Sequence, residues 1–328
     1  MLVRLLVVLL VLCAAPVALS GTAYAQARAR GVPENADEPM REALRLLETI
    51  RVSNLDAPWR ANAFARMARV LARVGDAAAA RTMSDSALEA VVEPTKSPVP
   101  AIVSPGAIYA QLAQAYADLG DRENSQKLAE KAFELLQKLP DLAAKANLLP
   151  YLAIGLADIG NRDGAGLAAL EGLRAATQMK AGRDQIAALS QVTMAQAKIG
   201  DRNSAEDTLG IARQAAAAIT DPTGRVFALA HLARAEAAVG NLERARTLAR
   251  NSAEAYDHTQ TDPNFTTAQR VTTLGLIAVA QSEAQDRNAA LQAVKALKAT
   301  AAQLTQTYER FQALVTEVDT VVQVERRL

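Results

Sequence analysis

Residues 108–136 read IYAQLAQAYADLGDRENSQKLAEKAFELL and contain the pattern that decides the fold. Two alanine-rich segments flank the pair Gly120-Asp121. Glycine readily adopts the left-handed conformation that ends a helix, and an aspartate side chain can accept a backbone N–H at the start of the next helix. The stretch therefore predicts two antiparallel helices joined by a tight turn.

The same pair recurs along the chain, with successive spacings of 45, 40, 40, 40 and 45 residues. Its copies are Gly75-Asp76, Gly120-Asp121, Gly160-Asn161, Gly200-Asp201, Gly240-Asn241 and the degenerate Gln285-Asp286. Self-similarity at a period of this length is typical of solenoids, in which each repeat buries its apolar face against its neighbours. We expect about six antiparallel helix pairs.

Residue size also repeats at fixed distances from each turn. Small residues stand seven before the turn and five after it, namely Ala68, Ala113, Ala153, Thr193, Ala233 and Ala278, then Ala80, Ser125, Ala165, Ala205, Ala245 and Ala290. Large apolar residues stand eight and eleven before it, namely Met67, Leu112, Leu152, Val192, Leu232 and Ile277, then Phe64, Tyr109, Leu149, Leu189, Leu229 and Leu274. A three-residue offset puts both large residues on one helical face, so these positions predict the core.

These features resemble the tetratricopeptide repeat family over about residues 60–300. The best-matching unit has Tyr109, Leu112, Ala113, Tyr116, Gly120 and Ala132 in register. The resemblance implies an all-α fold, a right-handed α-solenoid. Two features depart from the family: the period is near 40 residues instead of ~34, and the place four before the turn changes along the chain. That place is Leu71, Tyr116 and Leu156 in the early units, but Gln196, Glu236 and Gln281 in the later ones.

The expected organisation has a flexible tail at 26–36 and a tetratricopeptide-like solenoid at 37–303 that begins with a capping helix at 37–53. A second capping helix is expected at 304–328. The six units lie near 57–93, 105–140, 141–181, 182–220, 221–261 and 262–303. Residues 93–106 contain four prolines, which cannot sit inside a regular helix, and predict a stiff extended loop.

Residues 1–25 have the layout of a signal peptide. Arg4 precedes an apolar run, and Ala23-Tyr24-Ala25 ends the segment, so cleavage is expected before Gln26. An inner-membrane anchor is the alternative if the signal is not cleaved. After cleavage we expect no stable membrane insertion. Cys13 is the only cysteine, so the mature protein would be exported without any disulfide, which suits a bacterial periplasm.

Charge excludes some partners. Without Arg4 the mature chain has 35 basic and 35 acidic side chains. A balanced chain lacks the electrostatic attraction that supplies most non-specific nucleic-acid affinity, and it has no polybasic stretch for an anionic membrane. Nucleic acid is therefore not an expected partner, whereas a protein or peptide is. The oligomeric state stays open.

No pattern in the sequence predicts an active site. The only histidines, His231 and His258, lie within predicted helices, where packing or surface roles are the ordinary interpretation. Residues 160–166 are glycine-rich but lack the lysine of a phosphate-binding loop. We expect no catalytic residues, no cofactor and no metal site, and therefore no enzyme. Trp59 follows Pro58 and is expected to pack the first capping helix onto the first unit.

The resemblance instead points to a concave groove lined by the first helix of each pair. Its groove positions, transferred by their distance from each turn, are Asn62, Arg69, Arg73, Gln114, Asp118, Asn147, Asp158, Met194, Lys198 and Arg234. Mixed charges and amides suit an extended peptide better than a lipid. Solvated helix sides are the alternative interpretation of the same residues.

Three functions remain open at this point. The first is a protein-interaction adaptor or scaffold of the cell envelope that binds a peptide or protein in the groove. The second is a non-catalytic helical subunit of an envelope enzyme assembly that acts on the cell wall. The third is a structural protein that self-associates end to end through incompletely capped terminal helices.

Overall fold

The fold is described by a computed structural model, which covers residues 33, 36–91, 99–259 and 262–327. The predicted signal peptide and most of the predicted tail lie outside these described residues. Within them the chain forms α-helices and one short 3-10 helix, and no strand is found there. The elements are α2 (Asp37–Arg51), α3 (Ala57–Val74), α4 (Ala77–Ala90), η2 (Ala101–Val103), α5 (Pro105–Asp118), α6 (Arg122–Gln137), α7 (Leu142–Asp158), α8 (Arg162–Gln178), α9 (Arg183–Ile199), α10 (Arg202–Ala217), α11 (Pro222–Ala238), α12 (Leu242–Thr259), α13 (Thr267–Glu283), α14 (Arg287–Ala301) and α15 (Thr307–Glu325).

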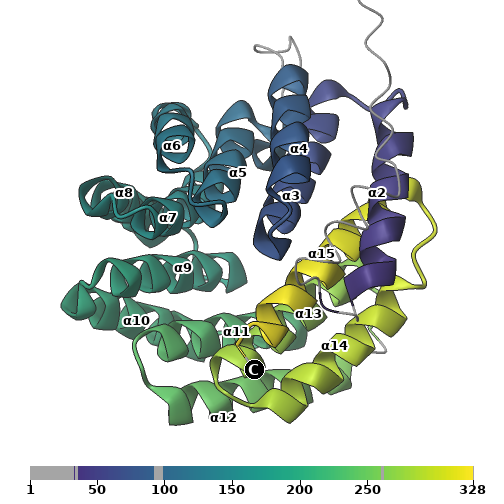
Figure 1. The fold of residues 1–328 in the computed structure, drawn as a ribbon. Helices are drawn as coiled ribbons and strands as arrows, with labels where there is room; N and C mark the ends of the chain where they lie inside the picture. The colour runs from purple at the N-terminus through teal and green to yellow at the C-terminus, as the bar shows by residue number, and fades with distance from the viewer. Residues whose placement is uncertain (1–32, 34–35, 92–98, 260–261, 328) are drawn as a thin grey trace, which may run out of the picture.

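Consecutive helices pack as six pairs, and the pairs stack one after another (Figure 1). The pairs are α3 with α4, α5 with α6, α7 with α8, α9 with α10, α11 with α12, and α13 with α14. The first helix of each pair also packs on the first helix of the next. The predicted all-α solenoid is confirmed.

The tight turns have the geometry that their sequences predict. Each turn glycine lies in the left-handed region, with φ between +74° and +92°, and Gln285 at the degenerate turn has φ of +61°. At the first turn the Asp76 N–H donates to the Leu71 carbonyl at 3.0 Å. The Asp76 side chain then accepts from the Ala79 N–H at 3.0 Å and caps α4. Glycine is needed here because other residues reach this conformation only with strain.

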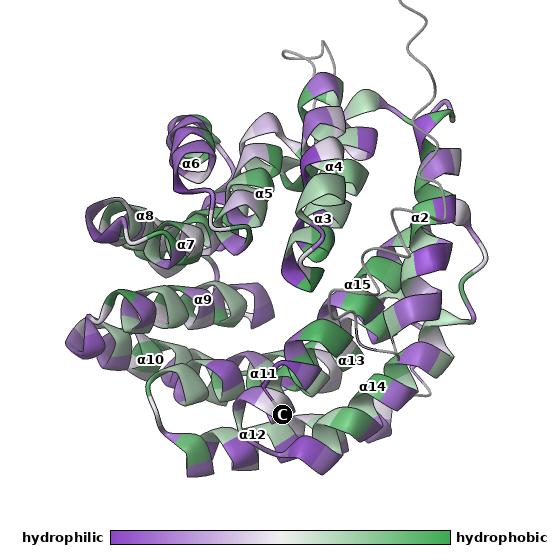
Figure 2. Ribbon diagram, viewed as in Figure 1, coloured by the Kyte–Doolittle hydropathy of each residue, from purple (hydrophilic) through white to green (hydrophobic). Residues whose placement is uncertain are grey.

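The core follows the repeat positions. All the small residues around the turns are buried, from Ala68 and Ala80 in the first pair to Ala278 and Ala290 in the last. The large apolar positions are buried too, except Leu229, which is half-buried. Small side chains let the paired helices approach closely, while apolar and hydrophilic stretches alternate along each helix (Figure 2).

The end of the proline-containing segment is helical, which corrects the expectation of an extended loop over all of 93–106. Residues 92–98 lie outside the described residues. Ala101–Val103 forms a 3-10 helix, and Pro105 begins α5. Ser104 caps α5 by accepting from the Ala107 N–H at 3.3 Å. Proline is compatible with a helix start because its missing N–H would have no partner there.

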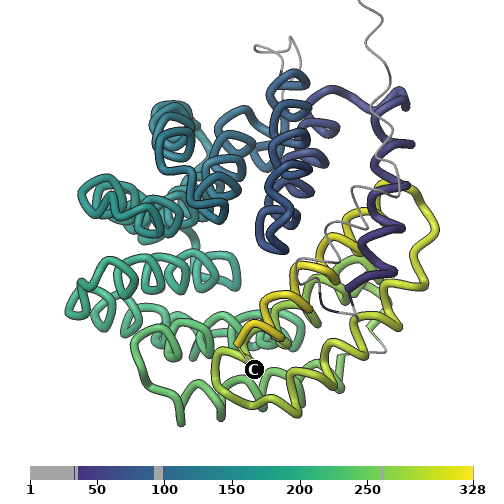
Figure 3. The backbone as a smooth tube through the Cα atoms, viewed as in Figure 1, coloured from purple at the N-terminus to yellow at the C-terminus, as the bar shows by residue number. Residues whose placement is uncertain are grey.

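The first and last helices that the structure describes pack together, which the sequence did not predict. Helices α2 and α15 pack on each other, and α15 also packs on α3, α13 and α14. Met40, Leu47 and Phe311 belong to one buried apolar cluster that joins α2 to α15. The solenoid is thus closed into a ring, as the tube shows (Figure 3). We call α2 and α15 the closing pair.

Trp59 marks the same closure. Its aromatic partner is Tyr308 at the start of α15, with ring centroids 5.6 Å apart in an edge-on arrangement. The sequence had placed Trp59 between the first capping helix and the first unit. The pairing instead joins the first unit to the last helix of the chain, because ring closure brings α15 onto α3.

Within the described residues, no helix combines the length and the apolar character needed to cross a membrane.

Candidate functional site

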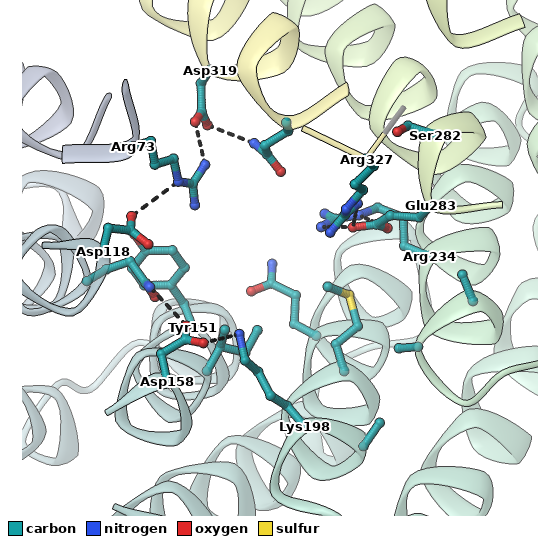
Figure 4. Close-up of a pocket in the computed structure, with 18 of the residues that line it drawn as sticks. Arg73, Asp118, Tyr151, Asp158, Lys198, Arg234, Ser282, Glu283, Asp319 and Arg327 are labelled. Carbon is teal, nitrogen blue, oxygen red and sulfur yellow. Dashed lines mark hydrogen bonds and ion pairs between the residues drawn. The ribbon is translucent and has the colours of Figure 1, made fainter. Parts of the chain in front are cut away.

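The inner surface of the ring borders an open cavity of about 930 Å³. Side chains from α3, α5, α7, α9, α11, α13 and α15 line it, together with residues just beyond α13 and α15. We call it the central cavity; Arg73, Tyr151, Lys198, Arg234 and Asp319 border it (Figure 4). The second helices of the pairs contribute no lining residue, so the wall is made of first helices and the closing helix α15.

A second cavity of about 590 Å³ adjoins the first. We call it the aromatic cavity; Trp59, Asn62, Asn147, Tyr151 and Tyr308 border it. Arg69, Tyr151 and Gln191 line both cavities. The two cavities therefore adjoin and share part of their wall.

All ten residues predicted for the groove line these two cavities. Eight of them line the central cavity, namely Arg69, Arg73, Gln114, Asp118, Asp158, Met194, Lys198 and Arg234. Asn62 and Asn147 line the aromatic cavity, as Arg69 also does. Whether these residues bind a partner stays a prediction.

Arg73 connects the first two units to the closing helix. Its Nε donates to Asp118 Oδ2 at 3.2 Å, and another guanidinium nitrogen donates to Asp319 Oδ1 on α15. Burial opposes charge at Asp319, yet Arg73 and then Arg69 hold the pKa of that carboxyl below its usual range. At Asp118 burial outweighs the attraction of Arg73, so the pKa of this carboxyl is raised. Of the two carboxylates, Asp319 therefore forms the stronger ion pair with Arg73.

Two further ion-pair groups line the central cavity (Figure 4). Lys198 lies 2.5 Å from Asp158, which also accepts from Gln114 at 3.2 Å. Glu283 accepts from Arg234 at 2.8 and 3.2 Å and lies 2.7 Å from Arg327.

Burial opposes charge at Glu283, but the two arginines keep the pKa of the Glu283 carboxyl below its usual range. Together these groups join helices from different units across the inner wall.

Arg69 differs from these cations because no carboxylate of the described residues lies in ion-pair contact with it. Its guanidinium stacks on the ring of Tyr151, with Cζ 5.0 Å from the centroid. The Arg69 Nε and the Tyr151 hydroxyl are both buried without a hydrogen-bond partner among the described residues. Buried polar groups are normally satisfied, so this pair is an exception that calls for a cause.

The aromatic cavity is built partly from the closing helix. Asn62 donates to the Tyr308 hydroxyl at 3.1 Å and accepts from Gln111 at 3.0 Å. Arg66 donates to the Thr316 hydroxyl at 3.1 Å. Because Tyr308 and Thr316 lie on α15, this cavity exists only in the closed ring.

The histidines show no arrangement suited to catalysis. His231 is half-buried on α11, and burial, reinforced by Arg234, lowers its pKa to about 3. A ring with that pKa stays neutral near pH 7 and is a weak base. His258 is exposed near the end of α12. The part of the chain that the structure describes contains no group of three or more His, Cys, Asp and Glu able to hold a metal. The absence of enzymatic activity stays a prediction.

Several lining residues were not predicted from the sequence, for two reasons. The predicted groove positions did not include the position nine residues before each turn. Four lining residues occupy that position, namely Arg66, Gln111, Tyr151 and Gln191. The ten predicted residues stand two, six and thirteen before their turns, and nine falls on the same helical face, so helical periodicity could have found them. Asp319 and Arg327 had no such signal because the C-terminal helix was expected to cap an open end.

A search of solved structures finds chains that are similar to this one at low sequence identity. BtubC (BKLC) from P. vanneervenii gives a TM-score of 0.43 and 17% identity, over 70% of this chain and 94% of its own. A Rap protein, solved in complex with Competence and Sporulation Factor, gives a TM-score of 0.39 and 13% identity, over 86% of this chain and 79% of its own. No family model matches the sequence, and no curated protein sequence matches it.

Proposed function

We propose that this chain is a non-enzymatic binding protein that holds a peptide, or an extended segment of a partner protein, inside its ring. The observation that carries the proposal is the inner wall itself. Two adjoining cavities, of about 930 and 590 Å³, fall in the size range of ligand sites, and the first helices line both with amides and charged groups.

The chemistry of the wall suits a peptide. An extended backbone presents N–H and C=O groups in alternation, and amide side chains such as Gln191 and Asn147 can both donate and accept. The aromatic faces of Trp59 and Tyr308 offer an apolar surface beside them. A mixed wall of this kind can satisfy the backbone of a peptide and also contact its side chains.

The structure argues against self-association through open ends. That mechanism requires terminal helices with an uncovered apolar face. Met40 and Leu47 of α2 and Phe311 and Val318 of α15 are instead buried within the same apolar cluster. The apolar faces of α2 and α15, which would have to contact neighbouring copies, are therefore covered within the molecule.

We also propose that the protein works in the cell envelope after export. The support is the signal-like layout of residues 1–25. Mass spectrometry of the protein from fractionated cells tests this proposal. A chain that begins at Gln26 in the periplasmic fraction supports it, and an intact N-terminus in the cytoplasmic fraction contradicts it.

Site-specific photo-crosslinking tests the binding function. A photoreactive amino acid replaces Gln191, which borders both cavities, and a control replaces Leu167, which is 57% exposed on α8 and borders neither. The proposal expects a partner protein or peptide to be crosslinked from position 191 and not from position 167. Equal products from both positions, or crosslinks only between copies of this chain, contradict it.

A further inference from the structure

We infer that Arg66, Arg69 and Tyr151 form a binding site for one carboxylate group of the ligand. The inference rests on the proposed function and deepens it, because it specifies which chemical group anchors the peptide. The site lies where the two cavities adjoin, since Arg69 and Tyr151 border both and Arg66 borders the aromatic cavity.

Charge balance gives the first argument. Six cations and five carboxylates border the two cavities: Arg66, Arg69, Arg73, Lys198, Arg234 and Arg327 against Asp118, Asp158, Glu283, Glu309 and Asp319. Asp118 and Asp319 pair with Arg73, Asp158 with Lys198, and Glu283 with Arg234 and Arg327. Among the described residues no carboxylate lies in ion-pair contact with Arg66 or Arg69. Arg66 and Arg69 are therefore the two cations of the cavities that have no carboxylate in direct contact.

Burial makes a cation without a carboxylate partner costly. Burial lowers the pKa of Arg66, and the positive charge of Arg69 lowers it further, while Tyr308 and Asp319 oppose the change. A buried charge without a counter-charge is unfavourable, and an anion placed beside it recovers part of the lost solvation. The free protein is thus poised to bind an anion between α3 and α7.

The unpaired donors give the second, independent argument. The Arg69 Nε–H and the Tyr151 O–H are both buried without acceptors among the described residues. The Tyr151 ring stacks on the Arg69 guanidinium and holds the plane of the guanidinium in place. A carboxylate has two oxygens that can accept from a guanidinium edge and a hydroxyl together. Both orphan groups would then be satisfied by one ligand group.

The size of the net charge favours a carboxylate over a phosphate. One carboxylate carries a single negative charge, which matches the net charge of +1 that six cations and five carboxylates give the two cavities. A phosphate monoester carries −1.5 to −2 at pH 7 and would meet repulsion from nearby acids. Asp319 is close enough to act on Arg66, and Glu309 borders the aromatic cavity from the exposed start of α15.

The test follows the side-chain Nε–Hε NMR signal of Arg69 during titration with sodium acetate at pH 7, against sodium chloride at equal ionic strength. We expect a saturable shift with acetate and none with chloride. Tyr151→Phe removes the hydroxyl donor and keeps the Arg69 donor, so it is expected to weaken acetate binding about tenfold. Arg69→Gln removes the reporter, so its acetate response is read from backbone amides of α3 and α7, where it should vanish. The matched control Arg174→Gln, on the exposed face of α8, should bind acetate as the unchanged protein does.

Three peptides then separate the sources of the carboxylate: acetyl-tetra-alanine with a free C-terminus, its C-terminal amide, and the amide with one alanine replaced by glutamate. A shift from the first or third that the second does not give supports the site and identifies the source. Equal shifts of cavity residues from all three overturn the carboxylate site but leave peptide binding intact. Acetate binding at Arg69 with no response to any peptide keeps the site and contradicts the peptide function. The same Arg69 response to acetate and chloride overturns the inference outright.

Discussion

The internal pair α7–α8 and the closing pair α2–α15 share one architecture but are held together in different ways. A three-residue turn, Ile159–Asn161, joins α7 to α8. Their contact is apolar and close: a Cβ placed on Gly172 would lie 2.6 Å from Pro150. The helices of the closing pair are the first and the last that the structure describes, and charged side chains accompany their apolar contact.

This difference has an energetic consequence. Contacts between distant parts of a chain must offset a larger loop-closure entropy than contacts across a tight turn. Local opening therefore begins where the contacts are non-local and the packing is interrupted by charge. We expect the closing pair to open before the internal pairs. Since α15 also forms part of both cavities, the stability of the closing pair controls the proposed binding site.

The largest expected effect comes from Phe311→Ala in the closing pair. Phe311 is fully buried, so its truncation should lower the free energy of unfolding by about 3–5 kcal/mol. Leu152→Ala in α7 is the internal counterpart, with an expected loss of about 2–5 kcal/mol. Denaturant unfolding measures both losses, and hydrogen exchange shows where each acts. Faster exchange should be concentrated in α2 and α15 for Phe311→Ala. The same pattern of exchange in both variants would contradict the comparison.

Next in size is Asp319→Asn, which removes the better partner of Arg73. Arg73 is 14% exposed, so leaving its guanidinium with one weaker partner should cost about 3 kcal/mol. Asp158→Asn on the internal wall is the control, since Asp158 and Lys198 are 31% and 40% exposed and such pairs contribute about 1 kcal/mol or less. Equal losses in the two variants would show that closure adds nothing to this contact.

The pH dependence of Asp319→Asn follows from the lowered pKa of Asp319. A carboxyl whose folded pKa is depressed contributes stability above its unfolded pKa, near 3.8, and loses it as the pH falls through the folded pKa. The unchanged protein should therefore lose stability below about pH 4. The variant should lose less over the same range, as thermal unfolding at pH 2–5 can measure.

The internal pairs could be predicted from the sequence because their determinants are local. Gly160, Asn161 and the small residues around them specify a turn and a close contact within one unit. Repetition at 40–45 residues then specifies how units stack. Ten lining residues were predicted by their distance from each turn. Tyr151 and Gln191 could have been predicted in the same way.

Closure could not be predicted in this way. Closure depends on the small rotation between each unit and the next, which accumulates over the whole solenoid. No single sequence position specifies this sum. The contacts of Arg73 with Asp319 and of Trp59 with Tyr308 join residues that no repeat spacing relates.

A third effect, of opposite sign, is expected from Glu317→Gln. Glu317 is buried on α15, and burial raises its pKa to about 7, with Lys298 and Arg310 opposing the change. The folded protein binds this proton more tightly than the unfolded chain, so stability falls as the pH rises from about 4.5 to about 7.

Replacing the carboxyl by a neutral amide should therefore stabilise the protein at pH 8, by up to about 3 kcal/mol. It should also flatten stability between pH 4.5 and 7. Chemical unfolding at pH 5 and pH 8 checks both expectations. A loss of stability at pH 8 would show that Glu317 is held by its cationic neighbours as an ion, and that the closing pair is stabilised by this charge.

The smallest effect concerns Arg310, which donates to both oxygens of Glu42 at 2.9 Å across the closing pair. Its side chain is 17% exposed and that of Glu42 is 31% exposed, so Arg310→Gln should cost about 1 kcal/mol. Arg51→Gln is the matched control, because Arg51 pairs with Glu48 within α2 and is 45% exposed, with an expected loss of about 0.3 kcal/mol.

Arg310 also lowers the pKa of Glu317, so its loss should raise that pKa further and make Glu317→Gln more stabilising. The double variant should thus be more stable at pH 8 than the sum of the single effects predicts, since residues in one charge network are not additive. Additive effects would mean that Arg310 stabilises the protein through Glu42 and the Ala301 carbonyl without acting on Glu317. The two helices of the closing pair would then meet through separate contacts and not through one charge network.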